Sequence, residues 1–263
     1  MTKKTPKTGG TREIDLTPKT TFVSFLLDET GSMESIKDDT IGGFNEYVST
    51  LRTSGADILF SLVSFNSSRT EKRYVAEPIA DVAPLAAGDY RPHASTPLID
   101  ACVKIIKATD EAVARRADEP NVVIVIQTDG QENVSVEYDR RDLAALVKEK
   151  EAAGWEFVFL GAGMDAFDAA MAAGMALRAD RVLSYGRDRS AEAFAGMAMH
   201  VSDFAARGSS TALDISPEVR EAAGDEFHGR RERRSRKGRR EPTKREARGS
   251  GHADGSTVDD IEL

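Results

Sequence analysis

The chain has 263 residues, and its 44 acidic against 36 basic side chains give a formal charge of −8. Hydrophobic residues make up 40% of it, which is enough for the core of one sizeable domain. No apolar run approaches the ~18 residues of a membrane-spanning helix, and the polar N-terminus lacks the apolar centre of a secretory signal. The single Cys102 has no partner for an internal disulfide, and no Cys/His spacing is typical of structural zinc. We therefore expect a cytoplasmic protein without a membrane segment.

Charge is unevenly distributed along the chain. The run 230–248 carries 11 basic and 3 acidic residues and a single apolar residue, an alanine. Such a segment cannot bury enough surface to offset its ordering entropy. We predict a disordered N-terminal segment over 1–19, a folded domain over 20–208, and a disordered tail over 209–263 with an acidic end. The basic run suits nucleic acid or an acidic partner, or serves only solubility, because no aromatic residue is interleaved for base stacking.

Within the expected domain, short apolar segments alternate with helical patterns. Buried strands are predicted at 21–27, 58–65, 121–127, 155–160 and 181–185. A polar, proline-containing run at 72–82 favours an edge strand in a hairpin. Helices are predicted at 33–52, from Pro97, around 143–147, at 164–174 and at 189–206. This alternation predicts an α/β fold with a doubly wound, mainly parallel sheet flanked by helices, in which ligands bind beyond the carboxyl ends of the strands.

Glycines interrupt two of these patterns. Gly42 and Gly43 each cost the first expected helix about 1 kcal/mol relative to alanine, and close packing on the sheet is one explanation. Gly161 and Gly163 follow a strand as in a dinucleotide-binding turn, but Ala166 stands at the position of the third glycine. A tight strand-to-helix turn is therefore favoured there.

Oxygen-bearing side chains gather at the expected strand ends. Asp28, Thr30 and Ser32 follow the first strand, Asp129 follows the most apolar strand, and Thr96 precedes a helix. If those two strands are neighbours, all five side chains converge on one crevice. Hard oxygen donors without Cys or His favour Mg²⁺, or Mn²⁺, over zinc or copper.

Each donor also has a purely structural alternative. Ser32 stands where a helix N-cap is expected, and Thr96 before Pro97 is a good cap and first-turn pair. Asp129-Gly130 is an ordinary turn dipeptide. Their joint position at strand ends along one sheet edge favours a metal site over separate coincidences.

These residues resemble the metal-ion-dependent adhesion site (MIDAS) of the von Willebrand factor type A (vWA) domain. That site is written D-x-[ST]-x-S, then Thr, then Asp, and the matching elements here are Asp28-Glu29-Thr30-Gly31-Ser32, Thr96 in STPLIDA and Asp129 in TDGQENVS. The resemblance covers about residues 20–207 and is greatest to compact intracellular bacterial and phage members. Thr30 stands where serine is usual, but it keeps the hydroxyl.

The resemblance implies a Rossmann-like vWA fold and a binding function. Ser32, Thr30 and Thr96 would be direct ligands of Mg²⁺ or Mn²⁺, with Asp28 and Asp129 as carboxylates that act through bridging water. Because hydroxyl ligands are neutral, the cation would keep an affinity for an Asp or Glu carboxylate from a protein partner. We therefore expect a divalent-cation-dependent protein-protein interaction module.

Two other functions stand beside this one. A Mg²⁺-dependent phosphatase-like hydrolase would use a strand-end nucleophile such as Asp28 with an acid two residues on, where Thr30 cannot serve. No Ser-His-Asp set is convincing, and His93, near Thr96, is more often solvated than a ligand contact as a lone loop histidine. We therefore predict that the protein is not an enzyme. Nucleic-acid binding through 230–248 would be steeply salt-dependent and would survive loss of the metal site.

Overall fold

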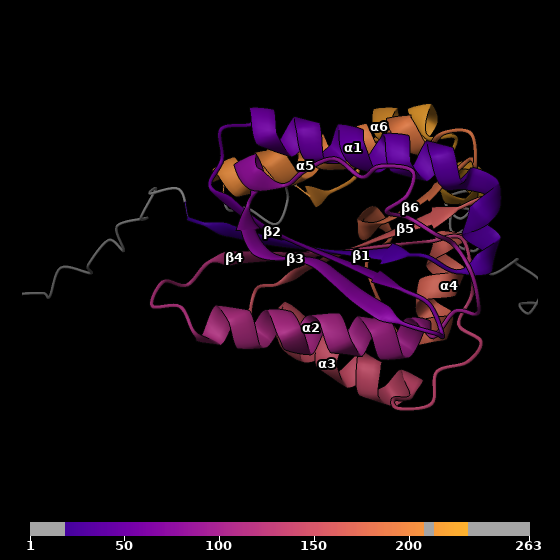
Figure 1. The fold of residues 1–263 in the computed structure, drawn as a ribbon, viewed down its shortest axis with the longest axis horizontal. Coiled ribbons are helices and arrows are strands. Elements are labelled where there is room, and N and C mark those ends of the chain that lie inside the picture. The colour runs from indigo at the N-terminus through magenta and orange to yellow at the C-terminus, as the bar shows by residue number, and fades with distance from the viewer. Residues whose placement is uncertain (1–18, 208–212, 231–263) are drawn as a thin grey trace, which may run out of the picture. The chain divides into compact units, whose positions relative to one another are not determined.

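The computed structural model describes residues 19–207 and 213–230 (Figure 1). Five parallel strands are β1 (Thr21–Asp28), β2 (Ile58–Phe65), β4 (Asn121–Thr128), β5 (Glu156–Ala162) and β6 (Val182–Tyr185). The antiparallel β3 (Thr70–Pro78) pairs with β2 at one edge, as its proline and charges predict. The sheet order is β3-β2-β1-β4-β5-β6, which confirms the predicted mainly parallel, doubly wound sheet. Contacts divide the chain after His228, and these elements belong to the first of the two units.

Helices cover both faces of this sheet (Figure 1). One face carries α1 (Lys37–Thr53), α5 (Ser190–Arg207) and α6 (Pro217–Ala222), and the other carries α2 (Leu98–Ala114), α3 (Arg140–Ala152) and α4 (Ala166–Ala173). Short 3₁₀ helices are η1 (Gly31–Ile36), η2 (Ile79–Asp81) and η3 (Ala179–Arg181). All eight residues of β1 are buried, because a strand covered on both faces has no solvent side.

The first helical segment differs from its prediction in two ways. The expected helix 33–52 begins as η1, because the Met33 N–H bonds to the Thr30 carbonyl three residues back (3.1 Å), and α1 starts only at Lys37. Gly43 approaches α5 rather than the sheet, since a Cβ there would lie 3.0 Å from the Ser190 carbonyl oxygen. A Cβ on Gly42 would meet nothing within 4 Å, so no close approach explains that residue.

The folded part of the chain continues beyond the predicted boundary at residue 208. Leu213, Ile215 and Ala223 are buried in the core, and the buried Arg220 donates to the Val182 carbonyl (2.8 Å). A disordered tail over 209–263 is therefore wrong for residues 213–228, since these apolar side chains offset the cost of ordering the segment.

The remaining predictions about the two ends fall outside the described residues. Residues 1–18 and 231–263 contain most of the expected N-terminal segment, nearly all of the basic run and the acidic end. Among the described helices, none has the length and apolar character needed to cross a membrane.

Candidate metal centre

The predicted donors lie at the edge of the sheet where β1 and β4 end. The two strands are parallel neighbours in a register that sets Leu27 opposite Gln127, so Asp28 and Thr128 come next to each other. Thr128 Oγ1 donates to Asp28 Oδ2 (2.5 Å), and the Thr30 N–H donates to Asp28 Oδ1 (2.7 Å). The neighbour relation on which the predicted convergence depends is therefore present.

Asp28 is a buried carboxylate with an altered acidity. Its side chain is 0% exposed, and loss of hydration raises its pKa to about 6. The hydrogen bonds from Thr128 and Thr30 lower the pKa and so limit the shift, while the charge of Asp129 adds to it. A bound cation would lower the pKa of Asp28, because a nearby positive charge favours the ionised carboxylate.

The Ser32 hydroxyl connects the loop after β1 to the loop after β4. Ser32 Oγ donates to Asp129 Oδ1 (2.5 Å) and lies 3.3 Å from Thr30 Oγ1. It caps no helix, because η1 has Thr30 at its N-cap and α1 has Ile36. The structural alternative for this serine is thus wrong.

Thr96 comes to the same place from the loop before α2. A Cβ built on Gly130 would lie 3.2 Å from Thr96 Oγ1 and 3.8 Å from Ser32 Oγ, so both hydroxyls border the space that this glycine leaves open. Thr96 also is not a cap, since Pro97 occupies that position without a side-chain bond. The first N–H groups of α2 are instead bound by side chains from the β4–α3 loop: Ile99 N to Glu132 Oε2 (2.8 Å) and Asp100 N to Ser135 Oγ (3.1 Å).

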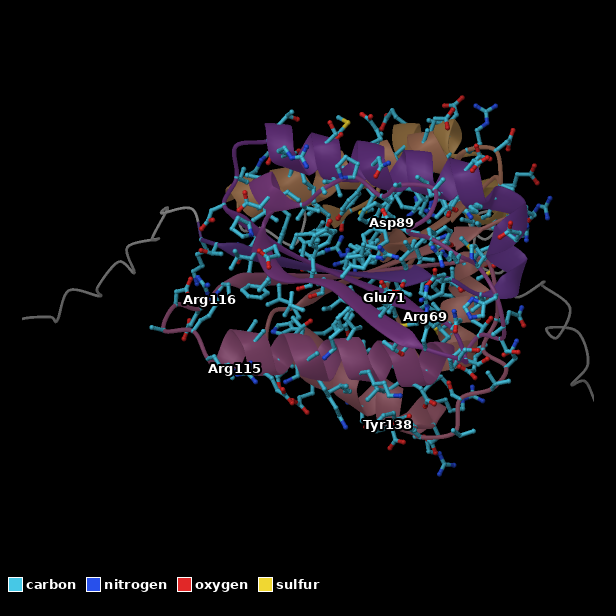
Figure 2. All side chains as sticks on the ribbon, viewed as in Figure 1. Arg69, Glu71, Asp89, Arg115, Arg116 and Tyr138 are labelled. Carbon is cyan, nitrogen blue, oxygen red and sulfur yellow. The ribbon has the colours of Figure 1, made fainter. Side chains whose placement is uncertain are left out.

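Backbone hydrogen bonds join the loop after β1 to the loop before α2, around the buried Glu29. The Gly31 N–H bonds to the Ala94 carbonyl (3.0 Å), and the His93 N–H bonds to the Glu29 carbonyl (3.0 Å). The Glu29 carboxylate pairs with Arg69 (2.9 Å), which also pairs with Glu71 on β3 (Figure 2). The unspecified residue between Asp28 and Thr30 is therefore an anchor for the site, a role that the motif did not indicate.

The loop before α2 and the loop after β4 are also joined by hydrogen bonds. Asn133 Oδ1 accepts from the Thr96 N–H (3.0 Å), and the Asn133 N–H donates to the Thr96 carbonyl (3.2 Å). The buried Asp100 accepts backbone N–H groups of residues 136–138. These contacts hold the segment after Asp129 against the start of α2, so the positions of Thr96 and Asp129 are coupled.

Arg187, on the loop between β6 and α5, was missed by the sequence analysis. It donates to Asp129 Oδ2 (3.0 Å) and to Ser35 Oγ (2.6 Å), and its side chain is 45% exposed. The sequence offers a weak signal, a strand end followed by Gly186-Arg187-Asp188-Arg189, which does not say which arginine turns inward.

Two further expectations concern residues near this edge. His93 is exposed and its Nδ1 lies 2.8 Å from the Arg91 carbonyl, in accord with a histidine that belongs to its own loop. At the end of β5, a Cβ on Gly161 would lie 2.6 Å from Ala166 Cβ, so the strand-to-helix turn is tight, as favoured over a dinucleotide site.

The donor set fits a hard divalent cation better than a soft one. No three His, Cys, Asp or Glu side chains within residues 19–207 and 213–230 are placed to hold a metal together. The Thr96 and Ser32 hydroxyls border the space beside Gly130, and the Thr30 hydroxyl and the Asp129 carboxylate lie next to Ser32. The Asp28 carboxylate accepts from the Thr30 N–H. Oxygen atoms of this kind, completed by water, suit Mg²⁺ or Mn²⁺.

Comparison with known proteins finds similarity in structure but not in sequence. No family model and no curated protein matches the sequence. The pilus adhesin SpaC from Lactobacillus rhamnosus GG is similar with a TM-score of 0.55 and 11% identity, over 70% of this chain and 31% of SpaC. Proximal thread matrix protein 1 from the mussel byssus has a TM-score of 0.52 and 15% identity, over 72% and 48%. A von Willebrand factor type A structure from Catenulispora acidiphila has a TM-score of 0.48 and 14% identity, over 70% and 43%.

These likenesses concern the fold alone, since all the identities are low. The chain spans about half the length of the mussel protein and about a third of SpaC. A mainly parallel six-stranded sheet with helices on both faces is the Rossmann-like arrangement that the vWA resemblance implied, and SpaC and the mussel protein share it, so the predicted fold class is confirmed.

Proposed function

We propose that this protein is a divalent-cation-dependent protein-protein interaction module that binds a carboxylate of its partner through a MIDAS-type centre. The observation that carries the proposal is the arrival of Ser32, Thr30 and Thr96 from two loops beside two carboxylates at one sheet edge. Mg²⁺ or Mn²⁺ is the proposed cation, because every donor is a hard oxygen.

The proposed roles follow from charge and burial. Ser32, Thr30 and Thr96 would contact the cation directly, while Asp28 and Asp129 would act through water and orient the hydroxyls. Asp129 Oδ1 accepts a hydrogen bond from Ser32 Oγ at an oxygen-oxygen distance of 2.5 Å, which suits an orienting role. Neutral direct ligands leave most of the cation's charge uncompensated, and this charge is the attraction for a partner's Asp or Glu.

The loop that follows Asp129 offers exposed apolar contacts for a protein partner. Val134 and Val136, on the loop after Asp129, are 39% and 89% exposed. An apolar contact next to a charged anchor is a common arrangement in protein interfaces. The partner's carboxylate would therefore give orientation, and the loops around it would give specificity.

The hydrolase alternative is less favoured by the geometry. A nucleophilic aspartate must reach its substrate, but the Asp28 side chain is 0% exposed and both of its oxygens accept hydrogen bonds. Thr30 at the acid position cannot donate a proton at neutral pH as a carboxylic acid does. Binding without turnover is the simpler use of this site.

One structurally similar protein bears on the choice of metal. The mussel byssus protein has a solved structure with a zinc occupied MIDAS motif, at a TM-score of 0.50 and 15% identity. Calorimetric titration of this chain with Mg²⁺, Mn²⁺ and Zn²⁺ in separate experiments would establish the preference. We expect binding of Mg²⁺ and Mn²⁺ at one site.

Affinity capture from native lysate tests the binding function. The chain should retain partners in Mg²⁺, release them in EDTA and regain them when Mg²⁺ is restored. Ser32→Ala should fail to capture them, while Ser68→Ala, at an exposed serine of the β2–β3 turn, should behave as wild type. Capture that is indifferent to EDTA and to Ser32→Ala would contradict the proposal, and turnover of a phosphate ester would favour the hydrolase.

A cytoplasmic location, an intracellular bacterial or phage type and nucleic-acid binding by the basic run stay predictions. Nucleic-acid binding is separable by experiment, because it should weaken steeply with salt and persist in Ser32→Ala.

A further inference from the structure

A positively charged side chain of the chain itself lies beside the proposed metal centre. The Arg187 guanidinium donates to Asp129 Oδ2 (3.0 Å), while Ser32 donates to Asp129 Oδ1 (2.5 Å). Both oxygens of this carboxylate are thus engaged from within the chain. The Asp129 side chain is 0% exposed and Arg187 is 45% exposed, so the ion pair lies at the rim of the centre.

Arg187 reaches this position across the end of a neighbouring strand. It follows β6, and β5 lies between β6 and β4 in the sheet. Gly163, just after β5, has a φ of +64°, and a Cβ there would lie 2.9 Å from both Arg187 Cγ and Nε. Because Gly163 has no side chain, the Arg187 side chain can pass over it. The position of Arg187 is therefore fixed in part by packing.

The charges at this edge require a counter-ion. Asp28 and Asp129 are both buried, and the pKa of Asp28 is raised mainly by its burial and further by the negative charge of Asp129. Arg187 supplies one positive charge at Asp129. A divalent cation held by Ser32 and Thr96 would supply two charges close to the same carboxylate, and would repel the guanidinium.

We infer that Arg187 is a built-in counter-ion that competes with the divalent cation for Asp129 and thereby sets the affinity of the centre for metal. The inference rests on the proposed function, because it assumes that the cation binds here. Without metal, Arg187 neutralises Asp129. With metal, the guanidinium must share or leave Oδ2, so its charge weakens metal binding.

Arg187→Met tests this by removing the charge while keeping an unbranched side chain. Removing a unit charge a few ångströms from a divalent cation should tighten Mg²⁺ binding about tenfold or more at low salt, measured by calorimetry. In EDTA the variant should melt at a lower temperature than wild type, because Asp129 loses its ion pair. Mg²⁺ should raise its melting temperature more than that of wild type.

Two further variants separate charge from other effects. Arg187→Lys retains the charge and should bind Mg²⁺ nearly as wild type does. Arg189→Met removes a charge from the same loop, but Arg189 pairs with Asp188 and Glu192 instead, so Mg²⁺ affinity should stay within about twofold of wild type.

The results distinguish this inference from the proposed function. Wild type that binds Mg²⁺, with Arg187→Met that binds it no more tightly, would overturn the inference alone. Absence of Mg²⁺ binding in both proteins would overturn the proposed function and the inference with it. Tighter binding by Arg187→Met but not by Arg189→Met supports both.

Gly163→Ala gives an independent test that keeps the arginine at position 187. The new Cβ would displace the arginine stem, so Mg²⁺ binding should tighten, by less than in Arg187→Met. Unchanged affinity in a folded Gly163→Ala protein would contradict the proposed path of Arg187.

Discussion

The ends of β1 and β5 lie at the same edge of the mainly parallel sheet, but the residues that follow the two strands differ in kind. After β1 the chain presents Thr30 and Ser32, whose hydroxyl oxygens lie 3.3 Å apart, and the Ser32 hydroxyl donates to Asp129 just after β4. After β5 it presents Gly161 and Gly163, and α4 packs so closely that a Cβ on Gly161 would lie 2.6 Å from Ala166 Cβ.

The difference shows that a position at the carboxyl edge does not by itself make a binding site. At the β5 end, polar groups are satisfied within the chain: the Ala166 N–H bonds to Ser184 Oγ (3.0 Å) and Asp165 caps α4 through the Asp168 N–H (3.1 Å). At the β1 end, the Thr96 and Ser32 hydroxyls come from two loops to the space beside Gly130, which follows Asp129 on a third loop. The β5 end affects the proposed centre indirectly, because Gly163 leaves room for the Arg187 side chain.

The largest expected effect is the loss of metal binding at the β1 end. Ser32→Ala removes a proposed direct ligand and should lower Mg²⁺ affinity about 100-fold, measured by calorimetry. Its melting temperature in EDTA should fall only modestly, because the buried Asp129 loses one hydrogen bond but no helix loses a cap. A large loss of stability with unchanged Mg²⁺ affinity would make the β1 end a packing element like the β5 end.

The opposite result is expected at the β5 end. Gly161→Ala forces β5 and α4 apart and should lower the free energy of unfolding by about 1 to 3 kcal/mol in urea titration. Mg²⁺ affinity should be unchanged. Gly42→Ala is the matched control, since the same substitution meets no atom within 4 Å in α1 and should raise stability by about 1 kcal/mol.

Thr96→Val sharpens the contrast within the centre. It keeps the shape of the side chain but removes the hydroxyl, so Mg²⁺ affinity should fall about tenfold, or ~1.4 kcal/mol. Stability should change little, because Glu132 and Ser135 bind the first N–H groups of α2. An unaltered calorimetric affinity would remove Thr96 from the ligand set.

The smallest effect is expected at His93. Its ring nitrogen lies against its own loop, 2.8 Å from the Arg91 carbonyl, so His93→Ala should leave Mg²⁺ affinity within about twofold of wild type. A tenfold loss in calorimetry would place this histidine in the centre and widen the β1 region of the comparison.

Much of the fold followed from local patterns. The strand 58–65 was predicted with the bounds that β2 has, and β1 and β4 each differ by one residue, because continuous apolar runs mark strands buried on both faces. Helix starts were less predictable, since the segment at 33 begins as a 3₁₀ turn. The segment 213–228 was misjudged because its few apolar residues are convincing only once the core that they cover is known.

Four of the five proposed donors could be chosen from the sequence because residues at the ends of parallel strands share one edge of a sheet, and Thr96 was chosen from its place before a helix and from the vWA pattern. Tertiary structure alone decided that β1 and β4 are neighbours, that Ser32 and Thr96 are not helix caps, and that Arg187 crosses Gly163 to reach Asp129. The physical reason is range: apolar periodicity and turn chemistry act within a few residues, whereas side-chain direction and ion pairing depend on atoms that the chain brings together from far apart.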